Sequence, residues 1–495
     1  MTTVDPRTPV IVGVGQITDR DGDASPLGLM AAAARRAAED AGTGGPGLLA
    51  RAGAVAVVDV FSWPIPDPAL LLREELGIAA AETVRSVIGG NGPLALLGDL
   101  ATRIGAGELD VALLAGGEVV TAFRRAMTRG EATGWPTQED GTAPDRLIGT
   151  DRPPSLPEEL AAGLAVPASY YPLFEHRLRH RAGRTTEEQQ RWIGSWWSRY
   201  SEVAAADPDA WRREAVSAEA AGLPGPGNRP ISDPYPKSMV ADITVDQGAA
   251  LLVCSAGAAE AAGIARDRWV FPHALAGGHD HWFVGERDAL DRSPAIAAIG
   301  AALREHTGVT VAELGPVDLY SCFPCAVQIA ARELGFDEDD LARPLTVTGG
   351  LHYFGGPAND YVTHALVRLV ERLREQPDAI GLSTAVGWYM TKHAALLLSA
   401  TPPARPFAAH DVQATVDAGP RREVVADPRG TFTIETFTVA YERDGTPTAG
   451  IVVALDATGR RAFARTTDAA TVAALLDRDP IGRTVELAGA DGVAL

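Results

Sequence analysis

Short apolar runs rich in β-branched residues alternate with helical patterns along the first 120 residues. Pro9–Gly15 and Ala54–Phe61 are typical of buried strands, and so is Asp110–Gly117, which stops at paired glycines. Ser25–Gly42 opens with an N-cap serine followed by proline and closes at a glycine, which predicts a helix. Strands that alternate with helices predict βαβ units and a mainly parallel sheet.

The same rhythm returns after residue 240, following a segment of different character. Residues 121–240 are richer in tryptophan, arginine and proline. Within them Trp192, Trp196, Trp197 and Tyr200 fall at helical spacing, which predicts a packed helix face. The chain therefore divides into an N-terminal α/β half, an inserted loop domain and a C-terminal α/β half. We expect these parts at residues 1–120 plus 241–270, 121–240 and 271–400.

Beyond a predicted linker at residues 401–411, which opens Thr-Pro-Pro-Ala-Arg-Pro, the pattern changes to short strands. Thr431–Val439 alternates with the two-residue period of a strand. Three further strands are expected at Gly450–Leu455, Arg461–Arg465 and Thr484–Leu487. This rhythm predicts a small antiparallel β-barrel, OB-like in its pattern, over residues 412–495.

The charge balance restricts the partners. With 44 basic and 64 acidic residues the formal net charge is −20, which repels phosphate backbones and anionic lipid, so nucleic acid is not an expected partner. An anionic ligand would need a local basic patch. No apolar run approaches the roughly 20 residues of a membrane helix. We therefore expect no membrane span. Met1–Thr8 carries no secretory pattern, so we expect a cytoplasmic protein.

Several motifs follow one another in a fixed order over about 400 residues. They are Val10–Gln16, Gly107–Glu118, Asn228–Pro234, Asp246–Ala250, Val317–Pro324, Gly349–Pro357 and Ser383–His393. In order and spacing they closely resemble the thiolase superfamily, in its sterol-carrier-protein branch. The forms Tyr-Ser-Cys-Phe-Pro and Gly-Gly-Pro, with the appended domain, most resemble the thiolase-like proteins of type 1. The resemblance implies a thiolase fold with αβαβα layers.

The resemblance also implies where catalytic residues should lie. A thiolase uses a nucleophilic cysteine, a histidine that activates it, a second cysteine that moves a proton, and an Asn or His near the thioester oxygen. The matching positions here carry Gly89 (within one residue), Gly356, Thr384 (or Ser383) and Tyr320. Glycine can neither attack a carbonyl nor accept a proton. Conventional thiolase turnover is therefore not expected.

The resemblance therefore implies a ligand pocket that lacks the nucleophile of a thiolase. Candidate pocket residues are Asn91, Tyr320, Asn359, Thr384 and His393. We predict a monomeric protein that binds an acyl-CoA or a similar thioester of lipid metabolism and needs no cofactor. Two alternatives stay open. One is an active acyl transferase or thioester hydrolase that uses Tyr320, Thr384 or a nearby histidine such as His364 or His393. The other is an interaction protein that acts through its C-terminal domain.

Three weaker signals favour structural roles. Cys322 and Cys325 lie between a predicted strand and helix, where a pair of buried thiols is favoured over a redox or zinc site. The Gly-Val-Gly after the first strand lacks the third glycine of a dinucleotide fingerprint, because that position is Thr18. His279 and His281 are expected to be hydrogen-bonded surface residues. No metal site is predicted.

Overall fold

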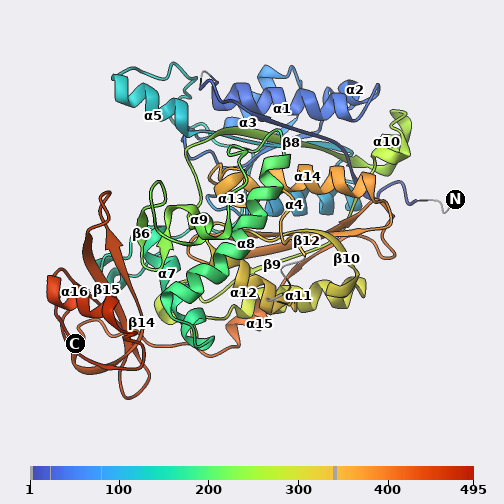
Figure 1. The fold of residues 1–495 in the computed structure, drawn as a ribbon. Coiled ribbons are helices and arrows are strands. Elements are labelled where there is room, and N and C mark those ends of the chain that lie inside the picture. The colour runs from blue at the N-terminus through green and yellow to red at the C-terminus, as the bar shows by residue number, and fades with distance from the viewer. Residues whose placement is uncertain (1–3, 23, 80, 338–339, 341–342) are drawn as a thin grey trace.

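The computed structural model describes residues 4–495 apart from 23, 80, 338–339 and 341–342. Its main body is a stack of helices, sheet, helices, sheet and helices (Figure 1). The central helical layer contains α4 (Gly92–Ala106) and α14 (Tyr361–Glu375), which both pack against strands of the two sheets. None of the described helices combines the length and the apolarity needed to cross a bilayer.

The first sheet has the strand order β1-β8-β4-β2-β3-β5. Its strands are β1 (Pro9–Thr18), β2 (Ala54–Val57), β3 (Glu82–Ser86), β4 (Val111–Val119), β5 (Arg146–Ile148) and β8 (Asp246–Ser255). Its outer face carries α1 (Pro26–Asp40), α2 (Gly45–Leu49) and α3 (Pro68–Glu75), with α10 (Ala256–Ala261) after β8 (Figure 1). Ser25 caps α1 as expected, since its Oγ accepts the Gly28 N–H at 3.0 Å.

The second sheet has the order β10-β11-β12-β9-β13. Its strands are β9 (Phe271–His279), β10 (Leu314–Asp318), β11 (Ile380–Gly387), β12 (Lys392–Ser399) and β13 (Ala408–Asp411). The helices of this half besides α14 are α11 (Pro294–Thr307), α12 (Pro324–Leu334), α13 (Gly350–Tyr353) and α15 (Gln413–Asp417). Short 3₁₀ turns occur at η1 (Lys237–Met239), η2 (Arg266–Arg268), η3 (Val284–Glu286) and η4 (Val311–Glu313). The last part of the predicted linker thus forms β13, a strand of this sheet.

Among the described residues, parallel pairing holds for three of the five strand pairs of the first sheet and for two of the four of the second, so both sheets are mixed. β8 runs antiparallel to both β1 and β4, and β12 runs antiparallel to both β11 and β9. The other pairs in the two sheets are parallel. The cause for β12 is the short turn after β11, because so few residues can join only antiparallel neighbours. For β8, the long insertion that precedes it allows the strand to run in either direction relative to its neighbours.

The insertion is mainly helical. It contains α5 (Val120–Arg129), α6 (Pro157–Ala161), α7 (Pro167–Arg181), α8 (Thr186–Ala206) and α9 (Ala218–Gly222). Trp196, Trp197 and Tyr200 are buried on α8, and Trp192 packs against the same core, which confirms the predicted helix face. The short hairpin of β6 (Pro230–Ser232) and β7 (Tyr235–Pro236) pairs with the C-terminal sheet through Ser232 and Ala440.

The C-terminal strands form an antiparallel sheet in the order β16-β15-β14-β17-β18, with its own apolar core. They are β14 (Arg429–Tyr441), β15 (Pro447–Leu455), β16 (Arg461–Thr466), β17 (Thr484–Ala488) and β18 (Val493–Ala494), with α16 (Ala469–Asp477) packed on β15. The predicted alternation and antiparallel pairing are confirmed, whereas closure into a barrel remains a prediction. Buried Arg461 binds Glu435 at 2.7 Å and donates to the Gly285 carbonyl of η3 at 2.9 Å, which joins this sheet to the main body.

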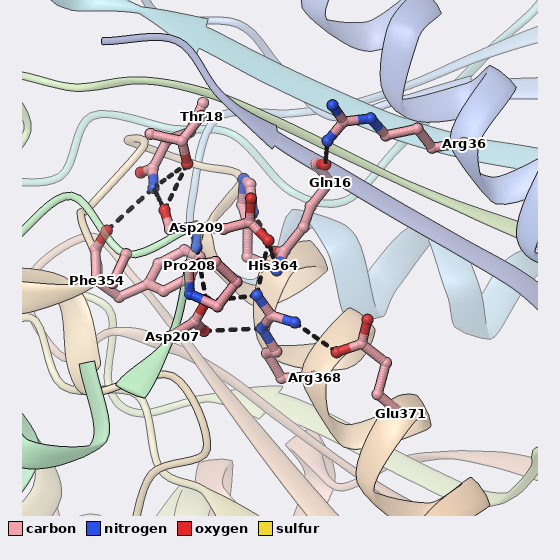
Figure 2. Close-up of polar contacts among 12 residues, drawn as sticks. Gln16, Thr18, Arg36, Asp207, Pro208, Asp209, Phe354, His364, Arg368 and Glu371 are labelled. Atoms are coloured by element: carbon pink, nitrogen blue, oxygen red, sulfur yellow. Dashed lines mark hydrogen bonds and ion pairs between the residues drawn. The ribbon is translucent and has the colours of Figure 1, made fainter. Parts of the chain in front are cut away.

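The chain that leaves α8 is fixed between β1 and α14 (Figure 2). Arg368 of α14 binds Asp207 through Nε at 2.8 Å and Asp209 through Nη2 at 2.7 Å. Figure 2 also shows Thr18 of β1 donating to the Asp209 carbonyl at 2.5 Å. These contacts set the position of the residues that follow, 211 and 212, which line a cavity described below.

Candidate functional site

The loop of residues 88–92 lies where the resemblance places a nucleophilic cysteine, directly before α4. Gly89 has a φ of +139°, a conformation that side chains strongly disfavour. A Cβ added there would lie 2.7 Å from Asn91 Oδ1 and 2.8 Å from both Cε and Nζ of Lys392. The loop therefore leaves no room for a side chain at residue 89.

Asn359 ties this loop to the rest of the site. Its Oδ1 accepts the Gly89 N–H at 2.9 Å, and its Nδ2 donates to the carbonyl oxygen and to Oδ2 of Asp59 at 3.0 and 3.2 Å. Burial raises the pKa of the Asp59 carboxyl, against the opposing effect of Arg85 at 3.0 Å. Asn359 thus holds the end of β2, the loop before α4 and the loop before α14 in one place.

Tyr320 and Thr384 meet on the other side of the same loop. The Tyr320 N–H donates to Thr384 Oγ1 at 2.8 Å, and the Tyr320 hydroxyl fills the space beside Gly90 that a Cβ would need. Burial raises the pKa of the Tyr320 phenol further above its ordinary value, so the group stays protonated. These residues offer a hydrogen-bond donor and an acceptor, but neither is an activated nucleophile.

Gly356 and His393 contact other partners. The Gly356 N–H donates to the Asp242 carbonyl at 2.9 Å, and a Cβ on Gly356 would lie 3.4 Å from Ala241 Cβ. His393 lies 3.2 Å from an Asp280 carboxylate oxygen and 3.0 Å from the Met390 carbonyl. Because neighbouring strand residues point to opposite faces, His393 faces away from Lys392 and from the loop of residues 88–92, called the glycine loop below.

His364, the other candidate base, is buried in the interior and bonds Gln16 Oε1 through Nδ1 at 2.9 Å (Figure 2). Burial lowers the pKa of its ring to about 3, so the ring is neutral.

Cys322 and Cys325 are free thiols. Burial raises the pKa of the Cys322 thiol to about 12, so this residue is not a reactive thiolate.

Lys392 is the residue that the sequence interpretation missed. Its side chain is 4% exposed and its Nζ donates to the Ile88 carbonyl and, at 3.4 Å, to the Thr150 carbonyl. Burial lowers the pKa of this ammonium to about 8, although Asp151 and Asp59 oppose the shift. One sequence signal pointed to it, since the chain contains only two lysines among 44 basic residues.

A second feature is a cavity of about 570 Å³ between the insertion, α5 and the turn that joins β14 to β15. Its basic residues come from distant parts of the chain and form no local pattern. They are Arg124, Arg212, Arg229, Lys237 and Arg443. Asp242 is the acidic residue of the lining, and it pairs with Arg212. Within the described ranges the other four cations have no carboxylate partner.

The basic cavity borders the loop that carries Gly356. The Trp211 and Arg212 N–H groups donate to the Phe354 and Tyr353 carbonyls at 2.7 and 2.8 Å. Asp242, also in the lining, accepts the Gly356 N–H. In a chain with a net charge of −20, a local excess of four positive charges is a specific feature that favours an anionic ligand.

Comparison with solved structures identifies the family. A monomeric SCP2-thiolase-like protein type 1 from Mycobacterium smegmatis shares 31% identity with this chain, covers 100% of both chains and superposes with a TM-score of 0.85. The chain belongs to the thiolase-like proteins of type 1. A family model described as the thiolase-like protein type 1 additional C-terminal domain matches residues 411–492. The predicted family and fold are confirmed.

More distant structures share the fold alone. The Ltp2-ChsH2(DUF35) aldolase is 19% identical, with 80% of this chain and 98% of that chain covered and a TM-score of 0.58. The dimeric peroxisomal thiolase of Saccharomyces cerevisiae is 14% identical over the same shares, with a TM-score of 0.57. No curated protein sequence matches this chain.

Proposed function

We propose that this thiolase-like protein binds an acyl-CoA or a similar phosphate-bearing thioester of lipid metabolism without thiolase turnover. The basic cavity beside the Gly356 loop supports the proposal most directly. Phosphate groups are bound in proteins mainly by Arg and Lys side chains, and four cations of this cavity have no carboxylate partner among the residues that the structure describes. We expect the protein to act as a monomer in the cytoplasm.

The distance between the cavity and the glycine loop suits a ligand with a charged end and a thioester end. Gly356 touches Asp242 at the cavity wall, and Asn359 holds the Gly89 N–H. Gly356 and Asn359 are three residues apart in the chain, so their Cα atoms are separated by at most about 11 Å. Phosphates in the cavity would leave a thioester within reach of Gly89, Asn359 and Tyr320.

The absence of thiolase turnover follows from the side chains at the motif positions. Gly89 and Gly356 carry none, and Thr384 Oγ1 already accepts the Tyr320 N–H. His393 is turned toward Asp280. These residues can orient a thioester by hydrogen bonds, but they supply no thiolate and no base for a Claisen reaction.

Titration calorimetry with CoA, acetyl-CoA and a phosphate-free pantetheine thioester tests the proposal. We expect the two phosphate-bearing ligands to bind and the pantetheine thioester to bind at least tenfold more weakly, with affinity falling as salt rises. Arg443→Ala and Arg124→Ala should each weaken CoA binding about five- to tenfold, or about 1 kcal/mol, as expected for a hydrogen bond from an exposed charged side chain. Arg429→Ala, an exposed arginine paired with Asp427 outside the cavity, is the matched control.

Two results would contradict the proposal. One is the absence of heat at millimolar CoA and acetyl-CoA. The other is equal binding of CoA by the wild type and by an Arg124→Ala, Arg443→Ala double variant, which would place any CoA site elsewhere.

A further inference from the structure

Lys392 fills the space beside Gly89, where the resemblance places the nucleophile of a thiolase. Its Cε and Nζ both lie 2.8 Å from the position of a Cβ on Gly89, and its Cε lies 2.9 Å from that of a Cβ on Gly387. Two glycines, one before α4 and one at the end of β11, therefore make the space for this side chain. The amine reaches the nucleophile position from the opposite side of the site, on β12.

The choice of lysine is itself informative. The chain has two lysines among 44 basic residues, so it uses arginine for nearly every cationic role. A guanidinium stays protonated and cannot attack a carbonyl, whereas a lysine amine can lose its proton and act as a nucleophile. A requirement for charge or for bulk alone does not account for a lysine at this position.

Burial favours the neutral form of the amine, whereas its two backbone-carbonyl contacts favour the ammonium. Nζ donates to two backbone carbonyls, those of Ile88 and Thr150, and no carboxylate of the described chain lies within ion-pair distance of it. Asp59 and Asp151 act on it only from farther away. With burial holding the pKa at about 8, roughly a tenth of the amine is neutral at pH 7.

The amine also lies close to the surface. Thr150 and Asp151 above it are exposed, and Ile88 and Trp388 beside it are half-buried. The Trp388 ring centroid is 5.9 Å from Nζ. A small molecule that approaches from this surface would have to displace the Thr150 carbonyl contact to reach the amine.

Backbone strain is concentrated around the same point. Among the described residues, those other than glycine with a positive φ are Ala358 (+37°), Trp388 (+55°) and Met390 (+53°). All three lie within four residues of Asn359 or Lys392. Such strain costs stability and is found mainly at active sites and ligand clamps.

The geometry points to Lys392 as an amine nucleophile that forms an imine with a ketone or aldehyde group of a ligand bound beside Gly89. The neutral Nζ forms a bond to the carbonyl carbon, and the π electron pair of the C=O bond moves to oxygen, which takes up a proton. The resulting carbinolamine loses water to give the protonated imine. The step involves no oxidation or reduction and needs no further reactant. The protonated Tyr320 hydroxyl beside Gly90 is positioned to donate a hydrogen bond to the oxygen.

The inference goes beyond thioester binding and is tested without it. The full-length protein is incubated with acetylacetone, a small 1,3-diketone that condenses with a neutral amine to a conjugated enaminone, and the product is followed by absorbance and located by peptide mass mapping. The only competing amines are Lys237 and the N-terminus. A second reaction, with acetone and sodium borohydride, reduces the imine and fixes it as an isopropyl group.

We expect Lys392 to be modified at least tenfold faster than Lys237, with a rate that rises with pH and levels off above about 8. Lys392→Met and Lys392→Arg, each checked for a native unfolding transition, should abolish this fast reaction. An Arg429→Lys variant adds an exposed lysine as a calibrant, and it should react at the slow rate. No reaction at Lys392, or a rate equal to that of the calibrant, would overturn the inference. Failure of CoA to bind would leave this result unaffected.

Discussion

Restoring a side chain at residue 89 tests how closely Lys392 and the glycine loop depend on each other. Gly89→Ala introduces two separate costs. The φ of +139° is strained for any residue with a Cβ, by about 2 kcal/mol. The new Cβ also lies 2.8 Å from two atoms of Lys392, and such overpacking costs about a further 2 kcal/mol. We expect the free energy of unfolding to fall by about 4 kcal/mol.

A double-mutant cycle separates the two costs. In a Lys392→Ala background the contact with Lys392 disappears, whereas the strain and the 2.7 Å contact with Asn91 Oδ1 remain. The cost of Gly89→Ala should therefore fall to about 3 kcal/mol. Urea unfolding followed by tryptophan fluorescence measures each corner of the cycle. Gly430→Ala is the matched control, because Gly430 has a φ of +95° and open space around its Cβ position. It should cost about 1 kcal/mol.

The reasoning is refuted if Gly89→Ala costs no more than Gly430→Ala, or if Lys392→Ala leaves the cost unchanged. Gly89→Cys should be destabilised like Gly89→Ala and should not gain thiolysis of acetoacetyl-CoA. Its thiol would enter space held by Lys392 and Asn91, and His393 is turned toward Asp280.

Two further predictions concern buried charges. Burial moves the pKa of Lys392 from 10.5 to about 8, which costs the folded state about 3 kcal/mol at pH 7. Lys392→Met removes that cost but also loses hydrogen bonds that contribute about 2 kcal/mol. Urea unfolding should therefore show a free energy of unfolding about 1 kcal/mol higher in the variant. Between pH 8 and 10.5 the folded wild type binds fewer protons than its unfolded chain, so its stability rises with pH. The variant should therefore be the less stable protein by about pH 10. A stability difference that does not change with pH would contradict the depressed pKa of Lys392. Arg461→Met leaves Glu435 buried without its partner and should cost about 4 kcal/mol by thermal unfolding, with much of the loss recovered by adding Glu435→Leu. An unchanged cost in the double variant would show that the carbonyl contacts to η3 dominate instead.

The sequence determined the family and the order of the elements, and it predicts the loss of the thiolase nucleophile. Hydrophobic periodicity and caps are local, so the strand at Pro9, the helix after Ser25 and the alternating strand at Thr431 followed from a few neighbouring residues each. The substitution at Gly89 was likewise visible, because motif order placed the loop directly before α4.

Only the tertiary structure brings Lys392 beside Gly89. Lys392 and Gly89 are 303 residues apart, and nothing local indicates that β12 directs the amine into the space left by the glycine. The basic cavity likewise gathers Arg124, Arg229 and Arg443 from α5, the insertion and the C-terminal sheet. The direction of β8 depends on the same long-range contacts, whereas the short turn after β11 determines that of β12. Contacts between distant segments depend on how layers pack, and local sequence patterns do not encode that packing.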